Sequence, residues 1–241
     1  MTAERRIEDQ AGGTYGSDEA AAGWRRSGVA RAQVLAPRTA RMLDLAGVGL
    51  GNRVLDVAAG TGEQTLAAAR RVGPTGAVLA TDIAAQMLAL AAEAAGQAGL
   101  RNVETRVLDA RELDLEPESF DAVISRLALM LLPKRAQALA SIHRALKSGK
   151  KFVALVLAMA DECPFVALPM GIAARLAGTP QAPFGDPGLF ALGNPAVLSP
   201  ATGPPGFARW PSSRCRSSGG SRRLRGPCKT SGTSWLKSRS C

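Results

Sequence analysis

The sequence predicts an α/β fold with a doubly wound, mostly parallel sheet. Short apolar runs rich in β-branched residues alternate with helical stretches of about 10 to 15 residues, which is the pattern of successive βαβ units. The first run leads into a glycine-rich turn that opens a helix. Helical connections of about 10 to 15 residues suit right-handed crossovers between parallel strands. With 241 residues, the chain is long enough for one large domain or two small ones.

The predicted elements follow one another in a regular order. Before the first strand, the apolar residues between Trp24 and Leu45 predict one or two amphipathic helices that are interrupted near Pro37. A later helix is predicted to start at Pro133, because proline suits the first helical position. The predicted strands are Arg53–Val57, Ala77–Thr81, Asn102–Leu108, Phe120–Ser125 and Lys151–Ala158, and the helices between them are Gln64–Val72, Ala84–Ala95 and Pro133–Leu146.

Changes in composition divide the chain into four parts. Residues 1–30 are rich in polar and small side chains and predict a mobile N-terminal arm or lid. Residues 31–160 carry the strand and helix pattern and form the predicted core. Residues 161–198 contain repeated prolines and a candidate helix, Met170–Leu176, and predict an insertion or cap. Residues 199–241 predict a disordered, basic tail of low complexity.

The net charge of +10 is concentrated in that tail, which holds nine Lys and Arg and no Asp or Glu. Residues 1–198 are left with 21 basic and 20 acidic side chains, a net charge of +1. General binding of nucleic acid by the core therefore loses its main electrostatic support.

The chain shows no apolar run long enough to span a membrane and no signal peptide, so a cytoplasmic location is expected. Of the four cysteines, only Cys163 lies before the tail. Their wide spacing predicts neither a zinc site nor a disulfide framework. No other cluster of metal ligands is visible in the sequence, and no metal is expected.

The most informative segment is Val54–Gly62, a strand that ends in a glycine-rich turn. Such a turn brings bare backbone N–H groups close to a ligand. Asp82 stands 22 residues after Gly60, at the end of the next strand, where an acid can accept hydrogen bonds from ribose hydroxyls. Together these features predict a bound nucleoside.

A dinucleotide site would use the same two features. The dinucleotide fingerprint also has a small third residue for close packing of helix and strand, but this chain has the β-branched Thr65 there. The carboxylate of Asp56 would in addition repel a pyrophosphate. A cofactor with a cationic sulfonium meets no such repulsion and is the preferred interpretation. An NAD(P)-linked oxidoreductase remains the alternative.

The segment from Arg53 to Ala158 resembles the class I S-adenosylmethionine-dependent methyltransferases. It is most similar to the ubiquinone/menaquinone-biosynthesis C-methyltransferase-like group, the methyltransferase type 11 group. The resemblance implies a Rossmann-like core, S-adenosylmethionine as cofactor and methyl transfer to a small acceptor.

The resemblance also assigns cofactor-binding roles to eleven residues of this chain. The residues implied around the methionine part of the cofactor are Asp56, Gly60, Thr61 and Gly62, and those facing the methionine end are Ser125 and Arg126. The resemblance implies that Asp82 binds the ribose hydroxyls. On the adenine it implies Ile83 and Met87, and at the adenine amino group Asp109 and Ala110. Tyr15 and Trp24 occupy the position of an N-terminal lid.

Simpler structural roles remain open for several of these residues. Asp56 or Asp82 could cap the following helix, Asp109 could be an ordinary turn residue, and Arg126 could be a surface charge. Residues 130–132 are expected in the core rather than in an acceptor pocket. His143, the only histidine, is expected to be solvated, so no catalytic residue is assigned.

The expected reaction needs alignment of donor and acceptor and exclusion of water more than it needs a base. Apolar residues in the 161–198 segment predict an apolar or aromatic acceptor, such as a quinone precursor methylated on carbon or oxygen. A non-catalytic S-adenosylmethionine binder and a basic-tailed interaction protein are the further alternatives.

The tail departs from the family pattern, which continues with two more strands. It contains no Val, Ile or Met, so we expect a sheet that lacks its last two strands. The abrupt change near Ser199 favours a frameshift that replaced the native C-terminus. A genuine basic tail that contacts RNA or anionic lipid is the alternative.

Overall fold

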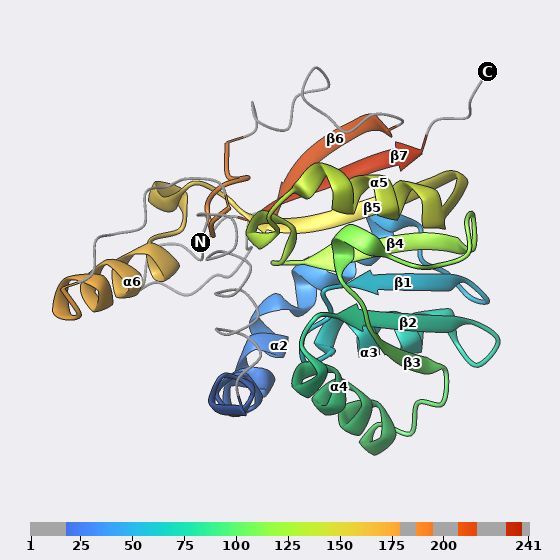
Figure 1. The fold of residues 1–241 in the computed structure, drawn as a ribbon, viewed down its shortest axis with the longest axis horizontal. Helices are drawn as coiled ribbons and strands as arrows, with labels where there is room; N and C mark the ends of the chain where they lie inside the picture. The colour runs from blue at the N-terminus through green and yellow to red at the C-terminus, as the bar shows by residue number, and fades with distance from the viewer. Residues whose placement is uncertain (1–17, 179–186, 195–206, 216–229, 238–241) are drawn as a thin grey trace.

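Five adjacent parallel strands and an antiparallel pair at one edge form a seven-stranded sheet in the computed structural model, which describes residues 18–178, 187–194, 207–215 and 230–237 (Figure 1). The strand order is β3-β2-β1-β4-β5-β7-β6. All five strands predicted from the sequence are confirmed to within a few residues. They are β1 (Arg53–Val57), β2 (Ala77–Asp82), β3 (Val103–Val107), β4 (Phe120–Arg126) and β5 (Leu146–Leu157).

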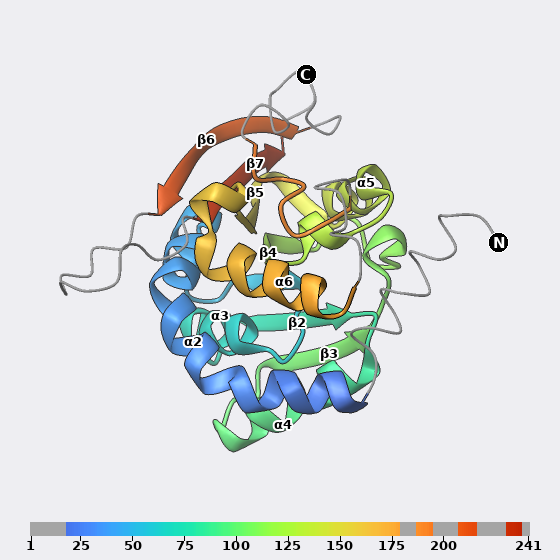
Figure 2. The same ribbon diagram turned by 90° about the vertical axis from the view of Figure 1, so that its left-hand side faces the viewer.

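Helices cover both faces of the sheet, and Figure 2 shows α2 and α3 on one side and α5 on the other. The alternation of side chains along each strand explains these layers, since Leu55 and its neighbours face α5 while Val54 faces α2 and α3. The helices are α2 (Asp18–Ala46), α3 (Glu63–Val72), α4 (Ala85–Gln97), α5 (Arg135–Ala145) and α6 (Pro164–Leu176), with short 3₁₀ turns η1 (Ala110–Glu112), η2 (Leu129–Leu131) and η3 (Ala160–Glu162).

Helix α2 is continuous through Pro37, so the predicted interruption there is wrong. Proline removes one backbone donor, but burial of Arg38 and Thr39 on the following turn holds the helix to the core. The guanidinium of Arg38 also donates to the carbonyl of Val34 at 3.0 Å. The helix therefore joins the predicted lid and core in one element, across the boundary expected at residue 30.

Helix α5 begins at Arg135 rather than at Pro133, which corrects the predicted start. Lys134 has a positive φ of 47°, so the chain turns there before the helix begins. The side chain of Arg135 donates to the carbonyl of Leu129 at 3.1 Å, which ties the new helix to the preceding turn η2.

Two strands in the tail correct the expectation that the sheet lacks its last pair. β7 (Thr230–Lys237) lies antiparallel beside β5, and β6 (Phe207–Cys215) lies antiparallel beside β7. The ladder uses backbone N–H and C=O groups, which residues of any composition except proline supply in full. The long edge of β5 thus pairs with a segment whose composition did not predict a strand. The inferred frameshift concerns the gene and stays a prediction.

The segment after β5 forms η3 and α6, which stand off from the sheet on the side where β1 and β2 end (Figure 1). The candidate helix Met170–Leu176 is the second half of α6. Cys163, at its start, is fully buried and disulfide-bonded, which the spacing of the cysteines did not predict. None of the described helices is long and apolar enough to cross a membrane.

Candidate functional site

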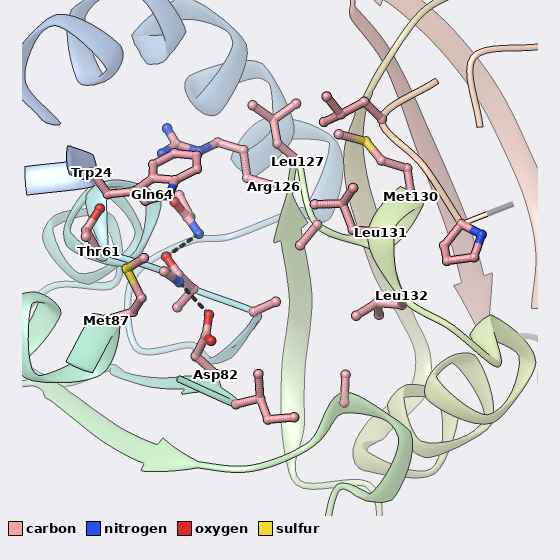
Figure 3. A pocket seen from close by; sticks show the side chains of 18 of the residues that line it. Trp24, Thr61, Gln64, Asp82, Met87, Arg126, Leu127, Met130, Leu131 and Leu132 are labelled. Carbon is pink, nitrogen blue, oxygen red and sulfur yellow. Dashed lines mark hydrogen bonds between the residues drawn. The ribbon is translucent and has the colours of Figure 1, made fainter. Parts of the chain in front are cut away.

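A cavity of about 620 Å³ opens at the carboxyl ends of the parallel strands. It lies where the strand order reverses between β1 and β4, which is the usual ligand position in open α/β sheets. Figure 3 shows side chains from α2, from the turn after β1 and from the end of β4 around it. Eight of the eleven predicted site residues line it: Gly60, Thr61, Asp82, Ile83, Met87, Asp109, Ala110 and Arg126.

Asp82 connects the glycine turn to the end of β2. One carboxylate oxygen accepts the N–H of Gly60 at 2.9 Å, and the other accepts the N–H of Ala84 at 2.9 Å (Figure 3 draws the first bond). Asp82 therefore holds the glycine turn to the loop before α4, and its carboxylate also lines the cavity; α4 has no side-chain cap at its N-cap residue Ala84, so the capping alternative is wrong. The two roles are compatible, since each oxygen can accept more than one hydrogen bond.

Gly62 lies outside the lining and has a packing role. Its φ is +82°, and a Cβ at this position would stand 2.7 Å from the Cβ of Ala91 on α4. Only glycine gives both the left-handed backbone and this close approach. The first turn of α3 can therefore pack against α4, which fixes the shape of the turn after β1.

Asp56 also lies outside the lining, fully buried beneath the glycine turn. Its carboxylate accepts the hydroxyl of Thr65 at 2.6 Å and the side-chain amide of Gln64 at 3.3 Å. These partners are side chains of α3 rather than its free backbone N–H groups, so the alternative of a helix cap is wrong. Burial raises the pKa of Asp56 to about 7, against the opposing effect of the two hydrogen bonds.

Glu63 is the centre of an ion-pair network that sequence analysis did not identify. Arg31 of α2 pairs with its carboxylate, and Arg126 at the end of β4 contacts it at 2.5 Å. The hydroxyl of Thr61 donates to Glu63 at 2.8 Å, and Arg31 also lies over the ring of Trp24, 4.4 Å from its centroid. The network joins α2, α3 and β4 at the cavity wall.

Arg126 is only 8% exposed, so the alternative of a surface charge is wrong. Its second nitrogen donates to the hydroxyl of Thr39 on α2 at 3.1 Å. Although burial raises the pKa of Glu63, the hydrogen bonds and charge of Arg31, with Thr61 and Arg126, hold it below its usual value. Glu63 is thus ionised at neutral pH, between two cationic partners.

The predicted adenine side of the cavity is built from the ends of β2 and β3. Ile83 is half exposed beside it and Met87 is buried against α2. Asp109 caps η1 by accepting the N–H of Arg111 at 2.8 Å and also pairs with its guanidinium. Asp109 therefore has the turn role that the sequence left open, while Ala110 packs into the core.

The other side of the cavity is apolar. Met130, Leu131 and Leu132 line it, although they were expected in the core alone, and Met130 is fully buried as well. Ser125 is buried in β4 outside the lining, and its hydroxyl has no hydrogen-bond partner among the described residues. His143 lies on α5 and is not part of the lining. In the part of the chain that the structure describes, no cluster of metal ligands occurs.

Comparison with known proteins finds similarity to methyltransferases over the centre of the chain. Residues 54–149 match a family model described as a methyltransferase domain. The ubiquinone/menaquinone biosynthesis C-methyltransferase UbiE of Pseudomonas savastanoi pv. phaseolicola is 39% identical over 114 residues, which are 47% of this chain and 44% of that protein. The demethylmenaquinone methyltransferase of Staphylococcus aureus is 38% identical over 115 residues, which are 48% of this chain and 47% of that protein. The matched segment thus spans less than half the length of these relatives.

The fold is also that of solved methyltransferases. A SAM dependent methyltransferase from Aquifex aeolicus superposes with a TM-score of 0.58 at 17% identity, covering 83% of this chain and 89% of that one. At this identity the likeness supports the fold alone. Residues 54–149 are thus similar to a methyltransferase domain, and the chain has the fold of solved methyltransferases.

Proposed function

We propose that this chain transfers a methyl group from S-adenosylmethionine to a small apolar or aromatic acceptor. The observation that carries the proposal is the division of a single cavity into a polar side, at the ends of β1 and β2, and an apolar side after β4. The polar side would hold the cofactor, and the apolar side would admit the acceptor next to it.

The charges of the lining fit this cofactor. Three carboxylates (Glu63, Asp82 and Asp109) and three guanidinium groups line the cavity. A cofactor with an amino-acid end and a sulfonium cation finds both signs there, whereas a pyrophosphate would have to lie beside the acids. Thr65, which argued against a dinucleotide site, is already bound to Asp56.

Within this proposal, the chain's residues hold the cofactor at three places. Gly60, Thr61 and Arg126 would contact its amino-acid part, Asp82 its ribose, and Ile83 with Met87 its adenine, with Ala110 behind. When bound, S-adenosylmethionine supplies a methyl group on a positively charged sulfur. The buried partners of the turn, Asp56 and Gly62, would act by fixing its shape.

Among the described residues, each carboxylate of the lining is already held by ion pairs or backbone hydrogen bonds. Glu63 is paired with two arginines, Asp109 with Arg111, and Asp82 with two backbone N–H groups. Such a site suits an acceptor that activates itself, such as an electron-rich ring carbon or an acidic hydroxyl. The chain then contributes alignment and exclusion of water by its apolar residues.

The names of the two sequence relatives suggest a quinone ring as the acceptor, and the apolar residues after β4 are compatible with one. We therefore place quinone precursors first in the acceptor class. The proposal of an apolar acceptor does not depend on this choice.

The test is transfer of a labelled methyl group from S-adenosylmethionine to a panel of quinone-type, phenolic and polar charged acceptors. The proposal predicts labelled product from apolar ring acceptors. Leu131→Arg, on the apolar side, should lower kcat/KM at least tenfold and leave the affinity for S-adenosylhomocysteine within about twofold. Methylation of polar acceptors alone would contradict the acceptor class, and cofactor binding with no product on the whole panel would favour a non-catalytic binder.

A further inference from the structure

Arg111 occupies the carboxylate of Asp109, one of the acids that line the cavity. One oxygen of Asp109 accepts the backbone N–H of Arg111 at 2.8 Å and its side-chain Nε–H at 3.0 Å. The other oxygen accepts the same Nε–H at 2.9 Å and an Nη2–H at 2.6 Å. A carboxylate offers about four acceptor positions, two on each oxygen. Arg111 therefore fills the hydrogen-bonding capacity of Asp109.

The turn that carries the two residues holds this pair in place. The hydroxyl of Ser141 on α5 donates to the backbone carbonyl of Arg111 at 2.9 Å, and Ala110 is buried in the core. The side chains of Arg111 and Asp109 are only 21% and 28% exposed. Although burial raises the pKa of Asp109, the hydrogen bonds and charge of Arg111 hold it below its usual value. Asp109 is therefore ionised at neutral pH and can only accept hydrogen bonds.

Both side chains line the side of the cavity that the ends of β2 and β3 build. The N–H of Leu108 donates to the carbonyl of Asp82 at 3.1 Å, which holds the turn after β3 beside the end of β2. In the proposed function the adenine of the cofactor lies on this side. A base placed there meets a carboxylate whose acceptor positions are taken and a guanidinium, which can only donate. The exocyclic amino group of adenine is itself a donor, so it finds no acceptor in this pair.

We propose that Arg111 withholds the Asp109 carboxylate from the adenine, so that this chain binds its cofactor without reading the amino group of the base. The inference rests on the proposed function, because it concerns the base of the proposed cofactor. Affinity then comes from packing of the ring on Ile83 and Met87 and from the ribose at Asp82. The role that the resemblance implied for Asp109, recognition of the adenine amino group, is blocked in this chain while Arg111 is in place.

The test is calorimetric titration of the full chain with S-adenosylhomocysteine and with its analogue in which purine replaces adenine, so that only the amino group is missing. The parent chain should bind the two ligands with affinities within about threefold of each other, because the site makes no hydrogen bond to that group. Arg111→Ala keeps the backbone N–H that caps η1 and releases the Asp109 carboxylate. It should prefer S-adenosylhomocysteine by roughly tenfold or more, because a hydrogen bond to a charged acceptor is gained.

Two further variants separate this effect from the loss of an ion pair. Glu104 and Arg106 on β3 form a pair with the same spacing at 2.8 Å, exposed and outside the lining, so Arg106→Ala should keep the affinity ratio of the parent. Asp109→Ala/Arg111→Ala lacks the released acceptor, so its ratio should also stay within about threefold. Each ratio compares two ligands on one protein, so any loss of folded protein cancels.

Selectivity for the amino group that rises only in Arg111→Ala supports the inference, since loss of a structural contact alone would not create it. A parent chain that already prefers S-adenosylhomocysteine by tenfold or more, with no rise in Arg111→Ala, would overturn the inference and leave cofactor binding intact. The same ratio in all four proteins would also overturn it. If neither ligand binds to a parent chain that circular dichroism shows to be folded, the proposed function fails together with the inference.

Discussion

Replacing Asp56 by asparagine tests the most unusual titratable group of the fold. Its carboxylate is fully buried and bound by Thr65 and Gln64, and burial raises its pKa from 3.8 to about 7. The folded chain therefore keeps this proton at a pH where the unfolded chain has lost it. The contribution of Asp56 to stability therefore falls as the pH rises from about 4 to about 7, and it is smallest when the pH lies above the pKa values of both the unfolded and the folded chain.

The size of the effect follows from the shift. A difference of about three pKa values at about 1.4 kcal/mol each amounts to about 4 kcal/mol, of which about 3 kcal/mol falls between pH 4.5 and 7.5. An asparagine side chain cannot titrate, so the variant lacks this contribution. The free energy of unfolding of Asp56→Asn, relative to the parent chain, should increase by about 3 kcal/mol over that interval.

The assay is urea unfolding of both proteins at several pH values, followed by circular dichroism. The difference between the two proteins is the useful quantity, because Glu63, Asp109 and Asp121, whose pKa values are lowered, contribute equally to both. A difference that stays constant within about 0.5 kcal/mol from pH 4.5 to 7.5 would refute the argument that the buried carboxylate keeps its proton.

Two further predictions concern the same turn and its surroundings. Gly62→Ala should lower the free energy of unfolding by about 3 kcal/mol, because of the positive φ and the overlap of the new Cβ with Ala91. Gly60→Ala, which has open space for its Cβ, should lower it by only about 1 kcal/mol. Thermal unfolding of the two variants checks this prediction, and equal losses would count against it. Glu63→Gln should cost about 3 kcal/mol at pH 7, because it leaves the buried Arg126 and the partly buried Arg31 without their carboxylate. The loss should shrink as the pH falls through the lowered pKa of Glu63, and a urea midpoint that is unchanged at pH 7 would contradict the prediction.

The sequence was most informative where structure follows from local pattern. The five parallel strands could be placed because buried runs and glycine turns alternate regularly, and Asp82 could be placed because it ends the strand after the glycine turn. The continuity of α2 through Pro37 could not be seen, since it depends on burial of the next turn against the core. The pairing of β7 with β5 depends on backbone groups that carry no sequence signal.

The candidate site shows the same difference between features that follow from local pattern and features that depend on distant contacts. Residues that belong to the nucleotide-type motif were found, but the partners that hold them were not. Glu63 and Arg31 are 32 residues apart, and only the fold brings them together beside Arg126. Thr65 counted in the sequence as a departure from a dinucleotide motif, yet its hydroxyl is the donor to Asp56. Contacts between distant segments have no periodicity, so a single sequence does not reveal them.

The central claim is that the polar side of the cavity binds S-adenosylmethionine through Asp82. Calorimetric titration of the full chain with S-adenosylhomocysteine tests it most directly, alongside Asp82→Ala and, as a matched control, Asp114→Ala at an exposed acid outside the lining. We predict micromolar binding that Asp82→Ala weakens by roughly tenfold or more, about 1.4 kcal/mol, and that Asp114→Ala leaves unchanged. Absence of binding to a chain that circular dichroism shows to be folded would contradict the claim.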